Sequence, residues 1–254
     1  MALPGGPGAW VGFALAHLEP GAEVAVPGPG YEAVVVPLRG AVSAGGLPLR
    51  GRADVLAGPT DVCHLPAGTP WRIRAGDLAA DVAVGLAPAA PGGEPRLVPA
   101  NEVAIERRGI GATEREVRHL YEADRPAQRL LVVEVVTPPG HWSSFPPHRH
   151  DEPEVLEEFY YCETRPASRA GYLHVFEDAG GPDEAVAVRD GDLCLVRRGY
   201  HTAASPPGTT LYYLNVMAGP SRTWAPVFHP AYRELVVGWE GAGLAARPGR
   251  GPAQ

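Results

Sequence analysis

Lysine is missing from this chain, in which all 22 positively charged side chains are arginine. Schiff-base catalysis, the anchoring of pyridoxal phosphate and Walker-type phosphate loops all require a lysine side chain. The sequence therefore excludes these three kinds of chemistry, whatever the origin of the arginine bias.

Positive charge is also sparse along the chain. The 22 arginines face 29 acidic residues, which gives a net charge of −7, and no run of five or more basic residues occurs. Proteins that bind nucleic acid usually carry a basic patch or stripe. We therefore expect no nucleic-acid partner.

Export and membrane signals are absent as well. Residues 1–21 lack both a charged start and a long apolar run, and no apolar stretch reaches the length of a membrane span. The three cysteines (Cys63, Cys162 and Cys194) are an odd number without C-x-x-C spacing, so buried thiols in a reducing compartment are expected. These features predict a cytoplasmic protein without membrane contact.

Short strands dominate the pattern, because β-branched and aromatic runs are repeatedly bounded by the 32 glycines and 29 prolines. Only residues 112–122 have a helical pattern, and residues 86–104 have the composition of a linker. We predict an all-β fold of two tandem β-sandwiches or barrels. The expected domains are residues 1–104 and 105–240, followed by a disordered tail at 241–254.

The stretch PPHRHDEPEVLEEFYY at residues 146–161 concentrates titratable side chains before a predicted strand. His148 and His150 are two residues apart, so on a strand they point to the same face. A carboxylate and a third imidazole would complete a ligand set that suits Zn²⁺, Mn²⁺ or Fe²⁺. The acidic candidates are Asp151, Glu152, Glu154, Glu157 and Glu158.

Glu157 is the favoured carboxylate ligand among these acids. Glu152 and Glu154 lie in a proline-containing loop, where solvation is expected. Glu157 and Glu158 begin the strand EEFYY, and alternation sends them to opposite faces. Glu157 would share its face with Phe159 and Tyr161.

These residues resemble the cupin superfamily, whose pattern is H-x-H, a following glutamate, and a later glycine and histidine. The segment GDLCLVRRGYH supplies the second part and adds His201. The resemblance implies one divalent metal per chain, held by His148, His150, Glu157 and His201. When Gly68 is aligned with Gly199, Pro70 takes the histidine position, so the first half is expected to be a metal-free cupin. His17 and His64 are then structural.

Four segments resemble one family more closely, the 5-deoxy-glucuronate isomerases of inositol catabolism. They are GHWSSFPPHRHD at 140–151, LEEFYY at 156–161, GYH at 199–201 and YYLNVMAGPSRTW at 212–224, and weaker likeness extends over residues 9–230. The resemblance implies a bicupin and the isomerisation of 5-deoxy-D-glucuronate to 5-dehydro-2-deoxy-D-gluconate.

That reaction moves a proton from C2 to C1 through an enediol, which a divalent metal stabilises. Candidates for the base are Glu158 or Asp151 among the carboxylates and Tyr200 or Tyr213 among the tyrosines. An arginine fork suits the substrate carboxylate, and Arg222 is favoured over Arg197 and Arg149. The partner is a small sugar acid, and a homo-oligomer is allowed.

Two other classes of function compete with the isomerase. A cupin dioxygenase uses the same ligand set with Fe²⁺ and binds O₂. A non-catalytic sugar-binding cupin often carries a helix-turn-helix, for which the chain offers no helical segment of sufficient length.

Overall fold

Strands make up nearly all the regular structure of the computed structural model, which describes residues 9–178 and 180–235. The described chain forms two compact units. The first takes the residues up to Ala104 together with His119–Val132 and Val216–Arg222, and the second takes Ile105–Arg118, Val133–Asn215 and the residues from Thr223. The predicted all-β class is confirmed.

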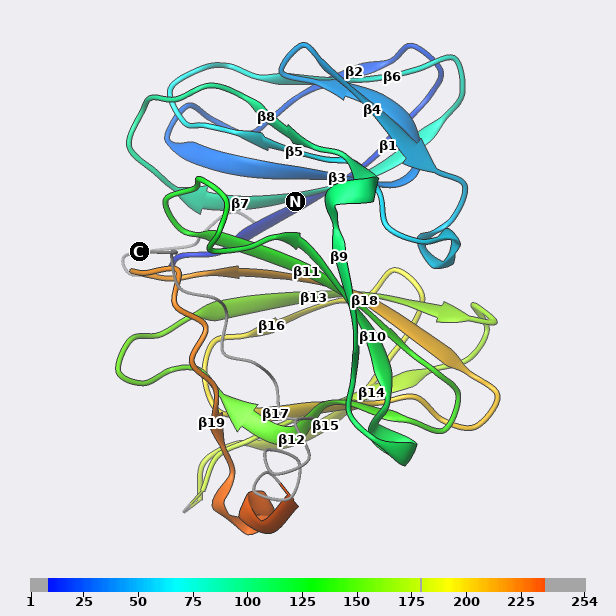
Figure 1. Ribbon diagram of the computed structural model, residues 1–254, viewed down its shortest axis with the longest axis vertical. Helices are drawn as coiled ribbons and strands as arrows, with labels where there is room; N and C mark the ends of the chain where they lie inside the picture. The colour runs from blue at the N-terminus through cyan, green and yellow to red at the C-terminus, as the bar shows by residue number, and fades with distance from the viewer. Residues whose placement is uncertain (1–8, 179, 236–254) are drawn as a thin grey trace. The chain divides into compact units, whose positions relative to one another are not determined.

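The first unit is built on an eight-stranded sheet. Its strands are β1 (Gly12–Leu18), β2 (Glu23–Ala25), β3 (Tyr31–Ala44), β4 (Leu47–Arg52), β5 (Val62–Leu65), β6 (Arg72–Ala75), β7 (Ala80–Pro88) and β8 (Arg96–Val98). The main path runs β1-β7-β3-β5-β8, while β4 and β6 also pair with β3, and β2 pairs with β6 (Figure 1). Short 3-10 helices follow β4 (Val55–Ala57) and β8 (Ala100–Glu102).

The long strand β3 serves two groups of partners because its register shifts around Gly40. Its first part pairs with β5 and β7, and its last residues pair with β4 and β6. Gly40 has φ of +76°, and a Cβ there would lie 2.5 Å from the Ala79 carbonyl oxygen. Only glycine fits this close approach at positive φ. Val35 and Val42, from the two parts of β3, are buried in one core.

The second unit contains a six-stranded and a five-stranded sheet. The first has the order β16-β13-β18-β11-β10-β9, and the second has the order β15-β14-β17-β12-β19 (Figure 1). The strands are β9 (Ala104–Arg108), β10 (Arg115–Tyr121), β11 (Leu130–Thr137), β12 (Trp142–Arg149), β13 (Glu157–Arg165), β14 (Gly171–Phe176), β15 (Asp183–Val188), β16 (Leu193–Val196), β17 (Tyr200–Ala204), β18 (Thr210–Ala218) and β19 (Val227–Phe228). Strands β10, β11 and β18 contribute residues to both units. Two more 3-10 helices span Gly111–Thr113 and Pro230–Tyr232.

Both sheets of the second unit supply the same apolar core. Tyr160 from β13 and Tyr213 from β18 belong to one cluster with Leu173 from β14 and Ala203 from β17. The inward face of β13 therefore carries Tyr160 and, by alternation, Glu158. This arrangement brings the polar residues of β13 toward those of β12 and β17.

Three expectations about individual segments need comment. The helical interpretation of 112–122 is wrong, because a one-turn 3-10 helix leads into β10, whose side chains alternate as in a strand. The predicted linker at 86–104 contains β8, which pairs with β5. The predicted disordered tail at 241–254 lies outside the described residues. No helix in the described part of the chain is long and apolar enough to cross a membrane.

Candidate metal centre

Three buried histidines converge between the two sheets of the second unit. His148 lies near the end of β12, His150 follows that strand, and His201 is the second residue of β17. Antiparallel pairing sets His148 opposite His201, and their ring centroids are 4.7 Å apart. One ligand atom from each of the three side chains lies within 4.8 Å of the others. The H-x-H spacing and the later hairpin thus meet as the sequence predicts.

Backbone carbonyls fix the orientation of all three rings. The Nδ1 atoms lie 3.2 Å from Pro146 O for His148, 2.7 Å from Leu156 O for His150, and 3.2 Å from Gly199 O for His201. If each Nδ1–H donates to its carbonyl, each Nε2 keeps a free lone pair. That is the tautomer in which a histidine binds metal through Nε2.

The Glu158 carboxylate completes the cluster from β13. Its Oε2 lies 2.9 Å from His150 Nε2 and 3.3 Å from His201 Nε2. His201 Nε2 is buried and has no partner with hydrogen-bond geometry in the described structure. A buried imidazole nitrogen beside a carboxylate and two further imidazoles is a donor set that a divalent cation would satisfy.

The electrostatics of the cluster follow from burial and proximity. Burial would raise the pKa of Glu158, but the contacts with His150 and His201 outweigh it and lower that pKa. Burial lowers the pKa of His148 well below its usual value, and the neighbouring imidazoles add to the effect. Burial also opposes protonation of His150, yet its hydrogen bond to Glu158 raises the pKa. The donor set of three imidazoles and one carboxylate fits a divalent metal.

The structure corrects the choice of carboxylate, because Glu157 does not join the histidines. Its Oε1 accepts a hydrogen bond from the Arg197 guanidinium instead. Phe159 and Tyr161 share its face of β13, as the sequence predicts, but the interior of the two-sheet core lies on the face of Glu158 and Tyr160. Glu157 as ligand is therefore replaced by Glu158.

The remaining acids of the segment also lie away from the histidines. Asp151 Oδ2 accepts the Gly199 backbone N–H at 2.9 Å, which fastens the turn before β17. Glu152 pairs with Arg149 at 3.0 Å, and Glu154 is exposed. Asp151 thus supports His201 through Gly199, whose carbonyl faces the His201 Nδ1.

A group of hydroxyls lies beside the histidines. Ser144 Oγ lies 3.1 Å from the Tyr160 hydroxyl and 3.2 Å from the Tyr213 hydroxyl, and the Tyr160 ring centroid is 6.0 Å from that of His201. Burial raises the pKa of Tyr213, so its phenol stays protonated at neutral pH. Ser144 has φ of +48°, a conformation that non-glycine residues adopt uncommonly. Tyr213 is the catalytic candidate that meets this group.

Tyr200 has a packing environment instead. Its ring lies edge-on to the His229 ring, with centroids 4.7 Å apart, and Arg149 stands over it at 5.1 Å. These contacts pack the Tyr200 ring between a histidine and a guanidinium, which is a structural role. The structure therefore gives no support to Tyr200 as the base.

The two arginines favoured for the substrate carboxylate are both engaged elsewhere. Arg222 donates to the backbone carbonyls of Leu130, Arg125 and Glu122, all within the first unit. These bonds occupy its fork, so the structure gives no support to Arg222 as the group that binds the substrate carboxylate. Arg197 is half-exposed and pairs with Glu157.

Arg115, the first residue of β10, was missed by the sequence reasoning. Its side chain is buried in the second unit, and its charge acts on the pKa of Tyr213. No motif surrounds it, since it lies 33 residues before His148 in a segment read as a helix. The sequence offers no signal that distinguishes it from the other charged side chains of that segment.

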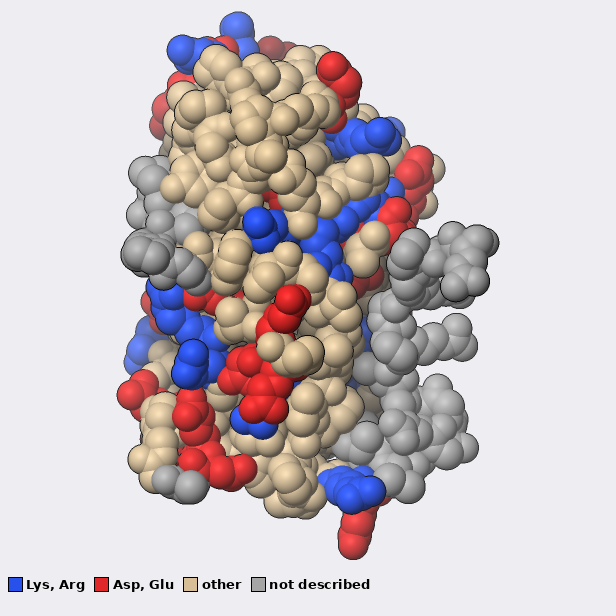
Figure 2. Space-filling model, turned by 90° about the vertical axis from the view of Figure 1, so that its left-hand side faces the viewer, with Lys and Arg blue, Asp and Glu red and all other residues tan. Residues whose placement is uncertain are grey.

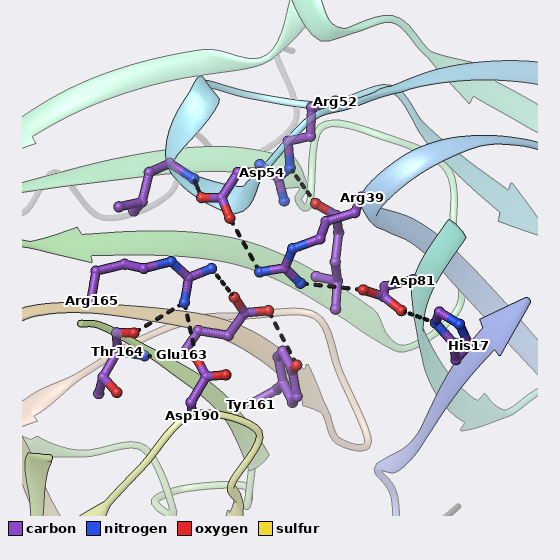
Figure 3. A network of polar contacts seen from close by, with 12 residues as sticks. His17, Arg39, Arg52, Asp54, Asp81, Tyr161, Glu163, Thr164, Arg165 and Asp190 are labelled. Carbon is purple, nitrogen blue, oxygen red and sulfur yellow. Dashed lines mark hydrogen bonds and ion pairs between the residues drawn. The ribbon is translucent and has the colours of Figure 1, made fainter. Parts of the chain in front are cut away.

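The histidines of the first half have structural partners. His17 Nδ1 lies 2.7 Å from Asp81, which also contacts Arg39, and Arg39 reaches Asp54 (Figure 3). His64 Nε2 lies 3.1 Å from the buried Glu32. In the described chain, only His148, His150 and His201 form a group of three or more potential ligands at such short separations.

A similar polar cluster in the second unit lies on the outward face of β13. Arg165 pairs with Glu163 at 2.8 Å and with Asp190 at 2.9 Å, and Tyr161 donates to Glu163 (Figure 3). On the face shown in Figure 2, arginines and acids lie interspersed rather than in one large area of a single sign. The charges of the Arg165 cluster thus form structural ion pairs, and those in Figure 2 form an ordinary mixed surface.

Comparison with known proteins gives consistent matches. The KduI/IolB family model matches residues 6–235. The 5-deoxy-glucuronate isomerase of Geobacillus kaustophilus is 44% identical over 166 residues, 63% of this chain and 60% of that protein. The protein of the same name from Listeria monocytogenes is 35% identical over 230 residues, 86% of this chain and 84% of that protein. The chain thus spans about three fifths of the Geobacillus relative.

Solved structures show the fold. An IolB-like protein from Salmonella typhimurium has 32% identity and a TM-score of 0.83, with 89% of this chain and 90% of that chain covered. The oxalate decarboxylase of Lactobacillus farciminis has 12% identity and a TM-score of 0.65, with coverages of 89% and 81%. The likeness to oxalate decarboxylase concerns the fold alone. The predicted tandem cupin architecture is confirmed.

Proposed function

The chain belongs to the KduI/IolB family, and from that premise we propose that it is an aldose–ketose isomerase. The proposed reaction converts 5-deoxy-D-glucuronate to 5-dehydro-2-deoxy-D-gluconate in myo-inositol catabolism. The isomerase names of its Geobacillus and Listeria relatives support this substrate. The observation that carries the proposal is the convergence of three buried histidines, with the Glu158 carboxylate 2.9 Å from His150 Nε2 and 3.3 Å from His201 Nε2.

The proposed metal ligands are His148, His150, Glu158 and His201, and the proposed ion is one Zn²⁺, Mn²⁺ or Fe²⁺ per chain. When bound, such an ion supplies a Lewis acid that stabilises the negative charge of an enediolate. The protein's own contribution is orientation, since three carbonyls hold the imidazole rings and a buried carboxylate balances charge. The second half therefore holds the metal, and the first half is metal-free.

Tyr213 is the side chain that we assign to the substrate oxygens. Isomerisation moves a proton between carbons C2 and C1 and also changes which of the two neighbouring oxygens carries a hydrogen. A protonated phenol donates one proton and accepts another at the same oxygen, so it suits exchange between adjacent oxygens. Ser144 holds the Tyr213 hydroxyl in place, and Tyr160 shares that contact.

A chelation assay tests the proposed function. The purified protein is assayed with 5-deoxy-D-glucuronate before chelation, after chelation, and after addition of Zn²⁺, Mn²⁺ or Fe²⁺. We expect the ketose product before chelation. Turnover should be lost when the metal is removed, and it should recover with at least one of the three ions. Unchanged turnover in a protein shown by elemental analysis to be metal-free would contradict the metal assignment. The cytoplasmic location and a homo-oligomer stay predictions.

A further inference from the structure

Arg115 is a buried cation without an acidic partner in the described structure. Only 8% of the residue is exposed. Its two hydrogen bonds run to backbone carbonyls, from Nη1 to Thr113 O at 3.0 Å and from Nη2 to Phe145 O at 3.3 Å. A guanidinium has five N–H donors in a planar fork, so most of its donor capacity is left for another group.

The buried Arg118 on the same strand differs, because it is paired with Glu116 at 2.8 Å and with Glu134 at 3.4 Å. Burial lowers the pKa of Arg115 to about 10, which still leaves it charged at neutral pH. A buried charge that lacks a counter-charge is destabilising, so the site favours an anion.

The neighbours of Arg115 connect it to the metal centre. Its Nη2 donates to the carbonyl of Phe145, and the preceding residue, Ser144, contacts the hydroxyls of Tyr160 and Tyr213. The charge of Arg115 and that of Glu158 both act on Tyr213. The rings of Tyr160 and Tyr213 are 5.0 Å apart. The Tyr160 ring in turn lies 6.0 Å from the His201 ring, so Arg115 and the histidines share these neighbouring tyrosines.

A second arginine adds positive potential at the same place. The charge of Arg108 acts on Arg115, and Arg108 lies over the Trp224 ring at 5.6 Å. The Trp224 ring is in turn 6.1 Å from the His148 ring. The charge of Glu106 also acts on Arg115, but Glu106 forms its ion pair with Arg108, at 2.7 Å, and Arg115 forms none among the described residues.

We propose that Arg115 binds the carboxylate of the sugar acid, while the aldehyde end lies at the metal centre. This inference rests on the proposed function, because it is that reaction which places a carboxylate and a carbonyl at opposite ends of one carbon chain. A guanidinium fork matches a carboxylate with parallel hydrogen bonds, which gives affinity and direction. Arg115 thus selects an acid over a neutral sugar and sets which end reacts.

The neighbouring Asn215 fits the same arrangement. It lies two residues after Tyr213 on β18, so it shares that face, and its buried Nδ2 has only the Tyr160 hydroxyl as a neighbouring acceptor, without full hydrogen-bond geometry, among the described residues. Buried amide donors are normally satisfied by protein, water or ligand. A hydroxyl of the sugar acid supplies an acceptor for this donor.

The test compares the metal-loaded protein with Arg115→Met and Arg115→Lys on two substrates, 5-deoxy-D-glucuronate and neutral 5-deoxy-D-glucose. The exposed Arg189, also in the second unit, gives the matched control Arg189→Met. Wild type and control should prefer the acid by about 100-fold in kcat/KM, whereas Arg115→Met should lose most of that preference. Arg115→Lys should fall between, because a point charge replaces a fork.

Calorimetric binding of the two sugars separates this inference from the proposed function. If neither the wild type nor any variant isomerises either sugar, the proposed isomerase function is wrong. The binding data still test the role of Arg115. Tight binding of the acid by wild type and about 100-fold weaker binding by a folded, metal-loaded Arg115→Met supports the site. An unchanged preference for the acid in both Arg115 variants overturns it.

Discussion

At the scale of single residues, the metal centre depends on which of two adjacent glutamates faces the histidines. Glu158→Gln removes the charge that lies 2.9 Å from His150 Nε2, so metal affinity should fall by about 100-fold or more. Glu157→Gln is the matched control, because the Glu157 carboxylate pairs with half-exposed Arg197 and not with the histidines. Elemental analysis after dialysis against a weak chelator measures both variants.

If both variants keep the metal content of the wild type, neither glutamate is a ligand. Metal loss confined to Glu157→Gln would return the assignment to the residue that the sequence favours. The result expected here is metal loss confined to Glu158→Gln.

The histidines were predictable and the carboxylate was not, for a physical reason. An i, i+2 pair on a strand fixes a shared face, so His148 and His150 follow from spacing alone. Strand β13 is buried along nearly its whole length on both faces. Alternation then separates Glu157 from Glu158 without telling which face is the interior, and the choice guided by Phe159 and Tyr161 was wrong.

At the scale of elements, the turn between β16 and β17 positions the third histidine. Asp151 accepts the Gly199 N–H, and Gly199 has φ of +94°, a conformation that suits glycine. Asp151→Ala removes this anchor, so we expect about tenfold weaker metal binding with the ligands themselves unchanged. Asp151→Asn keeps an acceptor oxygen and should bind metal close to wild type.

A metal titration of both Asp151 variants checks this prediction. If alanine and asparagine bind metal as tightly as aspartate, the Asp151 bond does not hold His201 in place. Comparable losses in the two variants would point to the charge of Asp151 rather than to its bond to the turn.

Element types were predictable wherever burial imposed a period of two. The segment at 112–122 has the pattern of a helix because its many charged side chains resemble a solvated helix face. In the structure, Arg115 and Val117 lie on one face of β10 and Arg118 on the other. Arg118 is buried on this strand beside Glu134, which is distant in the sequence. A local sequence pattern cannot predict such a pairing.

At the scale of the whole molecule, stability should depend on pH through Glu32 in the first unit. This carboxylate is 1% exposed, accepts the backbone N–H groups of Gln128, Arg129 and Leu130, and lies beside His64. Burial would raise its pKa, but the bonds to His64 and the backbone outweigh burial and lower it. The ionised form is therefore the one that stabilises the fold.

The direction of the pH effect follows from that lowered pKa. Above the unfolded value of 4.5 the stabilisation is complete, and it is lost as pH falls through the lower folded value. Glu32→Gln should lower the free energy of unfolding by about 3 kcal/mol at pH 7. The difference from wild type should shrink below about pH 4.

Urea unfolding of wild type and Glu32→Gln at several pH values measures this dependence. The surface variant Glu154→Gln serves as the control, since Glu154 is exposed. A difference between wild type and Glu32→Gln that stays constant from pH 7 to acid would show that the Glu32 charge does not stabilise the unit.

The central claim is that this cupin isomerises a sugar acid without an oxidant. The most direct measurement follows 5-deoxy-D-glucuronate by NMR with the metal-loaded protein, under strict anaerobiosis and in air. A proton transfer between C2 and C1 consumes no O₂, so we predict the ketose 5-dehydro-2-deoxy-D-gluconate at the same rate in both. Turnover that requires O₂, or an oxidised product in place of the ketose, would contradict the isomerase and indicate a dioxygenase.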